Sequence, residues 1–204
     1  MEAQATALRA LAGEIAVCPN CDLAKTRTHA VPGEGNANAD IVFIGEGPGF
    51  YEDQQARPFV GPAGKFLDEL LSSIGLRRQD VYIGNVIKCR PPGNRDPLPA
   101  ETAACKPWLD RQLEILDPKV IVTLGRFSMG RYFPGQSISK IHGQPRRLGD
   151  ITIVPMYHPA AALHQASLRR VIQQDFQRLP ALLAEALKEL PKPRAPEAVQ
   201  MQLL

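Results

Sequence analysis

Four short, mainly apolar runs separated by amphipathic segments are the feature that most constrains the fold of this chain. Such runs are typical of strands buried on both faces of a parallel sheet. They cover residues 41–44, 81–86, 120–124 and, more weakly, 151–155. Between them, within residues 66–74 and 108–116, apolar side chains recur at helical spacing. This alternation predicts an α/β fold, a mostly parallel sheet covered by helices on both faces, with ligands at the carboxyl ends of its strands.

The two ends of the chain have patterns of their own. Apolar residues at helical spacing predict a first helix that ends just before Cys18. A last helix should begin at about Ser167, with a kink or restart at Pro180. Residues 191–204 contain prolines and few large apolar groups, so we expect a flexible tail there. A single domain is therefore expected over residues 1–190, a length that one hydrophobic core can fill.

Composition places only loose limits on function. The 204 residues carry 24 Lys and Arg against 21 Asp and Glu, and the net charge of +3 permits a nucleic-acid partner without requiring one. No stretch approaches the roughly 18 apolar residues that span a bilayer. Glu2 and Glu14 lie where a signal peptide would be basic. We therefore expect a soluble, cytoplasmic monomer with no membrane partner.

The four cysteines, Cys18, Cys21, Cys89 and Cys105, favour a metal centre over disulfides, which are rare in a reducing compartment. Both ligand pairs of a zinc site are usually close in sequence, so a C-x2-C pair with a C-x15-C pair is atypical for zinc. An iron-sulfur cluster needs only that four thiolates converge in space. On spacing alone, cluster and zinc are equally favoured, and unligated buried cysteines or a CxxC redox motif are the alternatives.

Polar motifs follow three of the four apolar runs. Residues 45–49 read GEGPG, but a nucleotide-binding glycine loop fits poorly, because Phe50 replaces the third glycine and Pro48 removes an amide donor. Asn85 ends the second run and His158 follows the fourth, so both should lie at the same edge of the sheet. Taken alone, such an Asn is usually a turn or cap residue and such a His is usually structural.

Four motifs in a fixed order, threaded through the cysteine positions, carry a resemblance to a known family. They are GEGPG with Glu52 and Asp53 downstream, RPFVG at 57–61, GNVIKCRPPGNR at 84–95 and HPAA at 158–161. From about Cys18 to Leu187 the chain resembles the family-four uracil-DNA glycosylases. The resemblance implies a three-layer α/β/α sandwich around a four-stranded parallel sheet, with a 4Fe-4S cluster on the four cysteines. It also implies an enzyme of base excision repair that flips uracil out of DNA and hydrolyses its N-glycosidic bond.

The resemblance assigns roles to individual residues. It makes Phe59 the aromatic platform for the extruded base, although a Phe between Pro and Val is ordinarily a core residue. Asn85 would read uracil and reject cytosine, and His158 would donate a hydrogen bond to O2 of the departing base. Glu46 and Glu52 are the implied carboxylates, with Glu52 also a candidate wall against the methyl group of thymine. The expected uracil-binding set is Glu46, Gly47, Glu52, Phe59, Asn85 and His158, of which Glu46, Glu52 and His158 are catalytic candidates.

The expected partner is uracil-containing DNA, single- or double-stranded, held through phosphate contacts. Leu163 is the candidate wedge that enters the space vacated by the base, although it could instead pack at the start of the last helix. The other DNA-contact candidates are Arg90, Arg95, Lys140, His142 and Arg146, each of which could equally be a solvated surface charge.

One departure separates this chain from relatives that trap uracil sites covalently. Those relatives have a basic insertion that ends in a catalytic histidine, between the Asn and the fourth cysteine. Residues 86–105 contain no histidine, so the sequence predicts turnover. No lyase lysine is evident, so we expect an abasic product. A non-catalytic iron-sulfur protein that binds DNA or senses redox state is the rival hypothesis. A nucleotide-dependent α/β enzyme is a third, which the broken glycine pattern disfavours.

Overall fold

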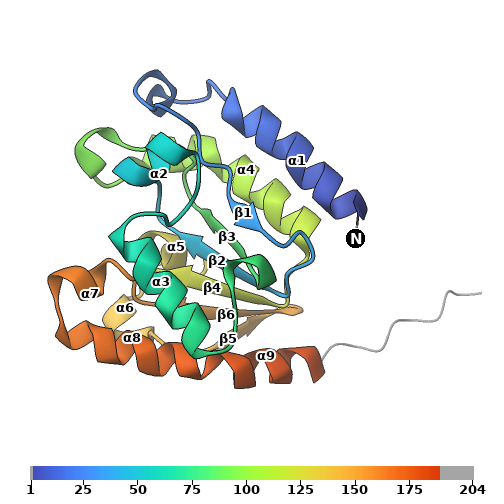
Figure 1. Ribbon diagram of the computed structural model, residues 1–204, viewed down its shortest axis with the longest axis vertical. Helices are drawn as coiled ribbons and strands as arrows, with labels where there is room; N and C mark the ends of the chain where they lie inside the picture. Colours follow the sequence, from blue (N-terminus) through green and yellow to red (C-terminus); the bar gives the residue numbers. More distant parts are fainter. Residues whose placement is uncertain (1, 189–204) are drawn as a thin grey trace, which may run out of the picture.

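The computed structural model describes residues 2–188, and its centre is a six-stranded β-sheet with helices on both faces (Figure 1). The strands are β1 (Glu34–Gly35), β2 (Ile41–Gly45), β3 (Tyr82–Asn85), β4 (Val120–Leu124), β5 (Arg146–Leu148) and β6 (Ile151–Met156). The longer helices are α1 (Glu2–Ala16), α3 (Pro62–Ser73), α4 (Pro99–Leu116), α8 (Ser167–Gln177) and α9 (Leu179–Lys188). Shorter helices are α2 (Phe50–Gln55), α5 (Arg126–Gly130), α6 (Ile138–Ile141) and α7 (Ala161–His164), with 3-10 turns η1 (Asp22–Lys25), η2 (Arg78–Asp80) and η3 (Pro92–Asn94). The tail predicted at 191–204 lies outside the described residues, so the domain boundary stays a prediction.

The sheet corrects one expectation. Its strand order is β1-β3-β2-β4-β6-β5, and only the four central strands are parallel. The expected four-stranded parallel sheet is therefore wrong for the sheet as a whole, because β1 and β5 add antiparallel edges. Neither edge strand has an apolar pattern: β1 is two residues long and β5 is exposed along its length. Their polar character suits sheet edges, which must resist pairing with other chains.

The four central strands confirm the four apolar runs, and their side chains alternate between two cores. Val42 and Ile44 of β2 pack on one face with α1 and α4, whereas Ile41 and Phe43 pack on the other with α3, α8 and α9. Figure 1 shows α1 beside α4 on one side of the sheet and α3 with α8 on the other. Burial of each large apolar side chain contributes roughly 1.5–3 kcal/mol, so this two-sided core holds helices on both faces of the sheet.

The helix ends agree with the predictions from sequence. Helix α1 ends at Ala16, before Cys18. The expected last helix is divided at Arg178 into α8 and α9, and Pro180 lies in the first turn of α9, where its missing N–H costs nothing. No helix within residues 2–188 is long and apolar enough to cross a membrane.

The connections place a crevice at the carboxyl edge of the sheet. After β2 the chain passes to α3 on one face, whereas after the neighbouring β3 it passes to α4 on the other. Adjacent strands whose connections diverge in this way leave an opening beyond their carboxyl ends, where α/β proteins bind ligands. The ends of β2 and β3 are Gly45 and Asn85, which are paired in the sheet.

Candidate active site

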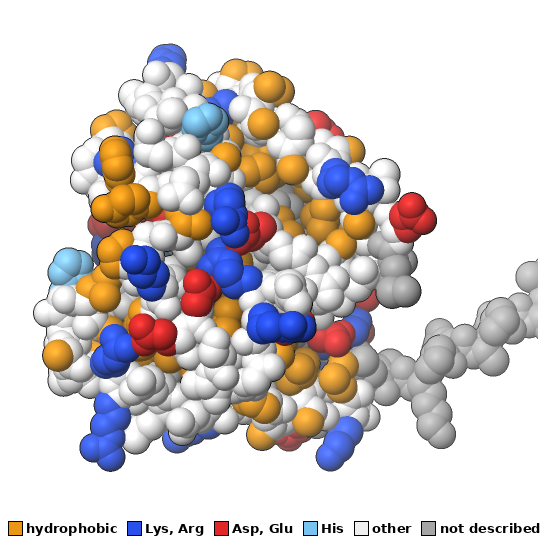
Figure 2. Space-filling view, in the orientation of Figure 1, with side chains coloured by type: hydrophobic (Ala, Val, Ile, Leu, Met, Phe, Trp, Pro, Cys, Tyr) orange, Lys and Arg blue, Asp and Glu red, His pale blue; other side chains and the backbone are white. Residues whose placement is uncertain are grey.

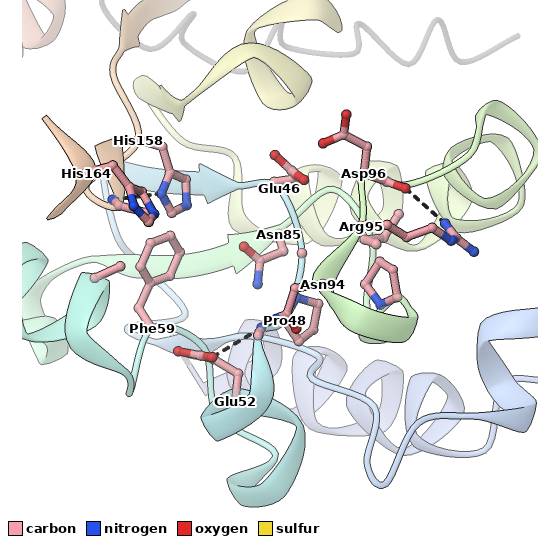
Figure 3. A pocket seen from close by; sticks show the side chains of 16 residues that line it. Glu46, Pro48, Glu52, Phe59, Asn85, Asn94, Arg95, Asp96, His158 and His164 are labelled. Atoms are coloured by element: carbon pink, nitrogen blue, oxygen red, sulfur yellow. Dashed lines mark hydrogen bonds between the residues drawn. The ribbon is translucent and has the colours of Figure 1, made fainter. Parts of the chain in front are cut away.

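A cavity of about 600 Å³ opens at this point, between the ends of β2 and β3 and the loop that follows β6 (Figure 3). All six residues of the predicted uracil-binding set line it: Glu46, Gly47, Glu52, Phe59, Asn85 and His158. They come from three regions that are far apart in sequence, residues 46–59, Asn85 and His158, and the strand order brings them together. Their roles in binding and catalysis are considered below as proposals.

Asn85 forms the floor of the cavity. Its side chain is 1% exposed, and its Oδ1 atom has no hydrogen-bond partner within the described residues. The side chain fits only because residue 45 is glycine: a Cβ there would lie 2.4 Å from Asn85 Oδ1 and 2.7 Å from Phe59 Cζ. A buried carbonyl oxygen left without a donor costs about 1–3 kcal/mol. The unpaired oxygen therefore indicates a site for a ligand that donates a hydrogen bond.

Phe59 forms a side wall of the cavity and has an unusual backbone. Its φ of 53° lies in the left-handed region that non-glycine residues rarely adopt. The ring stacks against His158, with centroids 5.4 Å apart and planes inclined by 23° (Figure 3). Gly64 makes this loop possible, since a Cβ there would lie 1.8 Å from the carbonyl oxygen of Phe59. The ring is thus an aromatic face held at the cavity by its surrounding backbone.

His158 follows β6, and its hydrogen bonds define its tautomer. The backbone N–H of Ala160 donates to His158 Nδ1 at 3.1 Å, so in the neutral ring the proton resides on Nε2. Burial lowers the pKa of His158 to about 4, although Glu52 nearby opposes that change. The imidazole is therefore neutral at pH 7, with an N–H donor at Nε2.

The two candidate carboxylates differ in their surroundings. Glu52 is fully engaged by backbone: Oε1 accepts from the N–H groups of Val60 and Gly61, both at 2.9 Å, and Oε2 accepts from Gly49 at 3.1 Å. Within the described residues, no hydrogen bond holds the Glu46 carboxylate. Burial raises the pKa of Glu46, and the negative charge of Asp96 raises it further against the opposing effect of Arg126.

Several lining residues were not predicted from the sequence. Asn94 and Asp96 come from the loop between Cys89 and Cys105, and His164 ends α7. Arg95, a predicted DNA contact, also lines the cavity, where it pairs with the buried Glu101 at 2.6 Å. The proline-rich sequence of this loop indicates rigidity, but no pattern in it specifies which side chains turn toward the cavity.

The remaining DNA-contact candidates lie outside the cavity. Arg90 places its guanidinium over the ring of Phe50, and Leu163 of α7 is 47% exposed. His142 Nδ1 lies 2.7 Å from Oδ2 of the buried Asp175. Lys140 and Arg146 are exposed on α6 and β5. The structure therefore groups the base-binding candidates in one place, whereas five of the six DNA-contact candidates lie outside the cavity.

The four cysteines form a second group, which includes Cys89, four residues after the carboxyl end of β3. Burial raises the pKa of Cys105 to about 11, and nearby Cys89 and Cys21 raise it further. Burial also raises the pKa of Cys89, and Cys21 and Cys18 add to that effect. N–H donors point at three of the sulfurs: Arg27 to Cys89 at 3.0 Å, Trp108 to Cys18 at 3.2 Å, and the Lys88 backbone to Cys105 at 3.2 Å.

Four free cysteines could hold either a single ion or a cluster. Within residues 2–188, no group of three or more His, Cys, Asp or Glu side chains is arranged to hold one metal ion. A zinc ion would need its sulfur ligands gathered at about 2.3 Å from one centre. An iron-sulfur cluster spreads its four thiolates around several irons, and hydrogen bonds to its sulfurs are usual. The neighbouring free thiols and their N–H donors fit a cluster.

The fold and the cavity are those of an α/β protein that binds a ligand at the carboxyl edge of its sheet. Comparisons with known proteins identify its family. The family model described as the uracil DNA glycosylase superfamily matches residues 32–190, so the chain belongs to that superfamily. The "Type-4 uracil-DNA glycosylase" of Archaeoglobus fulgidus is 50% identical over 81% of this chain and 88% of its own. That of Sulfurisphaera tokodaii is 48% identical over 81% of this chain and 80% of its own. A "Type-5 uracil-DNA glycosylase" of Thermus thermophilus is 36% identical over only 48% and 52%.

Proposed function

We propose that this protein is a monofunctional uracil-DNA glycosylase of base excision repair, which binds a flipped uracil in the cavity and hydrolyses its N-glycosidic bond to leave an abasic site. The main support is the buried, unpaired Oδ1 of Asn85. Uracil presents an N3–H donor beside the O4 acceptor, so N3–H donates to Oδ1 while Nδ2 donates to O4. Cytosine has the opposite pattern at these two positions, and each unpaired buried group costs about 1–3 kcal/mol.

The aromatic wall gives the base a stacking surface. A flipped base leaves its neighbours in the DNA stack, and an aromatic ring restores about 1–3 kcal/mol of that stacking. The Phe59 ring edge lies against Gly45 and Asn85, so a base that pairs with Asn85 would lie along the ring. Stacking and edge recognition therefore act on the same base.

His158 stabilises the leaving group. As the glycosidic bond breaks, negative charge develops on uracil, in part at O2. The neutral ring donates from Nε2–H, and a donor placed where charge develops lowers the barrier most. Because its pKa is about 4, His158 keeps this form throughout the physiological range.

The carboxylates of Glu46 and Glu52 have different roles. Glu46 has a carboxylate without a hydrogen-bond partner among the described residues, so it is available to orient water or to stabilise the cationic sugar. Glu52 joins the GEGPG loop to the loop that carries Phe59 and frames the cavity.

The four cysteines would hold a 4Fe-4S cluster with a structural role. Such a cluster, when bound, cross-links the segment after α1, the exit of β3 and helix α4. Cys89 lies four residues after Asn85, and the loop between Cys89 and Cys105 supplies Asn94 and Asp96 to the cavity. A cluster bound there would therefore hold the loop against the cavity, which is a structural role.

The test is release of uracil by cluster-loaded protein. Oligonucleotides with one uracil, single-stranded or paired with A or G, are incubated with the protein and then treated with alkali, which cleaves the strand at an abasic site. We expect cleavage that requires both the protein and the alkali. DNA binding without any cleavage would support the non-catalytic alternative instead.

A further inference from the structure

Two exposed aromatic side chains begin helix α2, immediately beyond the cavity. Phe50 is 50% exposed and Tyr51 is 51% exposed, and they follow Gly49, which lines the cavity. Their rings meet edge to face, with centroids 5.5 Å apart. Tyr51 also covers the loop after Phe59, since a Cβ on Gly61 would lie 3.1 Å from Tyr51 Cδ2. The pair therefore forms an aromatic rim on the α2 side of the cavity.

The side chain of Arg90 lies against this aromatic rim. The guanidinium of Arg90 lies 5.1 Å from the centre of the Phe50 ring. Its Nε donates to Asn94 Oδ1 at 2.7 Å, and Asn94 lines the cavity. Figure 2 shows apolar side chains in contact with basic ones at the left edge, over the region of α2. Adjacent exposed aromatics with a fixed arginine are typical of surfaces that bind single-stranded nucleic acid.

We propose that Phe50 and Tyr51 stack against the base of the nucleotide next to the flipped uracil, with Arg90 at a neighbouring phosphate. The inference rests on the proposed function, because a uracil in the cavity fixes where its strand must leave. Successive nucleotides of one strand are about 3.4 Å apart along a stacked strand, so a neighbour of the uracil must lie at the cavity rim. Removal of uracil from the stack uncovers one face of that neighbour, and the aromatic rim covers it.

This contact matters most for single-stranded DNA. In a duplex, the neighbouring base keeps its partner and the stack on its other side. In single-stranded DNA no complementary strand holds that base. The aromatic rim therefore contributes a larger share of the interactions that keep the base in place. The proposal thus predicts a larger loss for single-stranded than for double-stranded substrate when the rings are removed.

The experiment removes the ring from the protein and the base from the DNA, separately and together. The double variant Phe50→Ala, Tyr51→Ala is compared with wild type on uracil oligonucleotides in which the 5′ or the 3′ neighbour lacks its base. With all bases present, we expect kcat/KM for single strands to fall about tenfold through KM, in keeping with the loss of one stacked base. With the contacted neighbour already baseless, variant and wild type should differ by less than about twofold, because independent sites add and coupled sites do not.

Matched variants sharpen the result. Leu148→Ala removes an apolar side chain of similar exposure, 48%, from β5 and should leave every substrate unaffected. Phe50→Tyr with Tyr51→Phe should restore wild-type behaviour.

An equal loss with and without the neighbouring bases, or no loss, would overturn the proposal while leaving uracil release intact. Absence of uracil release by wild type would instead refute the proposed function. A dimer that dissociates in the double variant, without coupling to either base, would assign the rings to a second copy of the chain and also overturn the proposal.

Discussion

Arg78 donates a hydrogen bond from Nη1 to the carbonyl oxygen of Phe59 at 3.0 Å, and from Nη2 to that of Pro58. The guanidinium is itself held by Glu34 at 2.6 Å and Asp68 at 3.0 Å. In the same loop, Glu52 Oε1 accepts hydrogen bonds from the N–H groups of Val60 and Gly61, which follow Phe59. The left-handed backbone of Phe59 is thus fixed from both sides, and the ring that would support uracil depends on an arginine that does not line the cavity.

Substitution Arg78→Met should lower the free energy of unfolding by about 2 kcal/mol, since it removes charge-assisted hydrogen bonds and leaves two carbonyls without donors. Uracil release should fall about tenfold or more, because a small displacement of a positioning group is costly. Urea unfolding and kcat/KM measure the two effects.

The neighbouring Arg77 provides the control. It pairs with Asp80 at the surface, where such pairs contribute about 1 kcal/mol or less. Arg77→Met should leave uracil release unchanged, and an equal loss of activity in both variants would contradict a specific role for Arg78.

The sequence predicted the parts of the fold that have an apolar pattern, either an unbroken run or a helical spacing. The runs at 41–44 and 120–124 became β2 and β4 because a strand buried on both faces must be apolar throughout. The edge strands were missed because β1 and β5 bury too little for any pattern to form. The position of a short polar strand depends on the strand with which it pairs. After β5 the chain turns back at Gly149, which has a φ of 61°, so that β5 pairs with β6.

The residues of the candidate site could likewise be predicted only in part. Residues at strand ends, such as Asn85 and His158, could be placed at one edge because parallel strands end together. The clamp formed by Arg78 could not be foreseen, since it joins residues that are 19 and 20 positions apart through backbone carbonyls. The tautomer of His158 likewise depends on a single N–H in the following turn.

Asn85→Asp tests the recognition of the base edge. The carboxylate keeps an acceptor for N3–H but replaces the donor to O4, so uracil release should fall by roughly 100-fold while some cytosine release appears. Release of both bases is measured on matched oligonucleotides. Asn38→Asp, at an exposed turn, is the control and should behave as wild type. A variant that still releases uracil at the wild-type rate would remove Asn85 from recognition.

Glu46→Gln and Glu52→Gln should fail in different ways. The Glu46 variant should keep its stability and lose kcat by about tenfold to 100-fold, since it removes a carboxylate that faces the reaction. The Glu52 variant should unfold more easily, because one oxygen that accepts N–H groups becomes an NH2. Thermal unfolding and single-turnover kinetics distinguish the two, and the opposite pattern would reverse the assigned roles.

Cys89→Ala tests the metal centre. Loss of one ligand should abolish visible absorbance and bound iron, and the protein should unfold because the loop to Cys105 loses its anchor. Trp108→Phe is the matched control: it removes the N–H donor to Cys18 but no ligand, so the colour should persist with a more negative reduction potential. A colourless, stable protein that contains zinc would contradict the proposed cluster.

The acidity of His158 predicts a pH dependence of stability. The unfolded chain takes up a proton on this ring near pH 6.5, whereas the folded protein resists until about pH 4. Between these values the unfolded state binds more protons, so this residue lowers the free energy of unfolding as the pH falls from about 6.5 to 4 and has no such effect above 6.5.

In His158→Gln this part of the slope should disappear, which urea unfolding at a series of pH values can measure. Nitrogen NMR of the wild-type ring should show a proton on Nε2 and a midpoint near pH 4. A midpoint near 6.5 would mean that the ring is solvated and partly charged at neutral pH. The donor to O2 would then be an imidazolium for part of the population, and the neutral His158 inferred from the Ala160 hydrogen bond would be wrong.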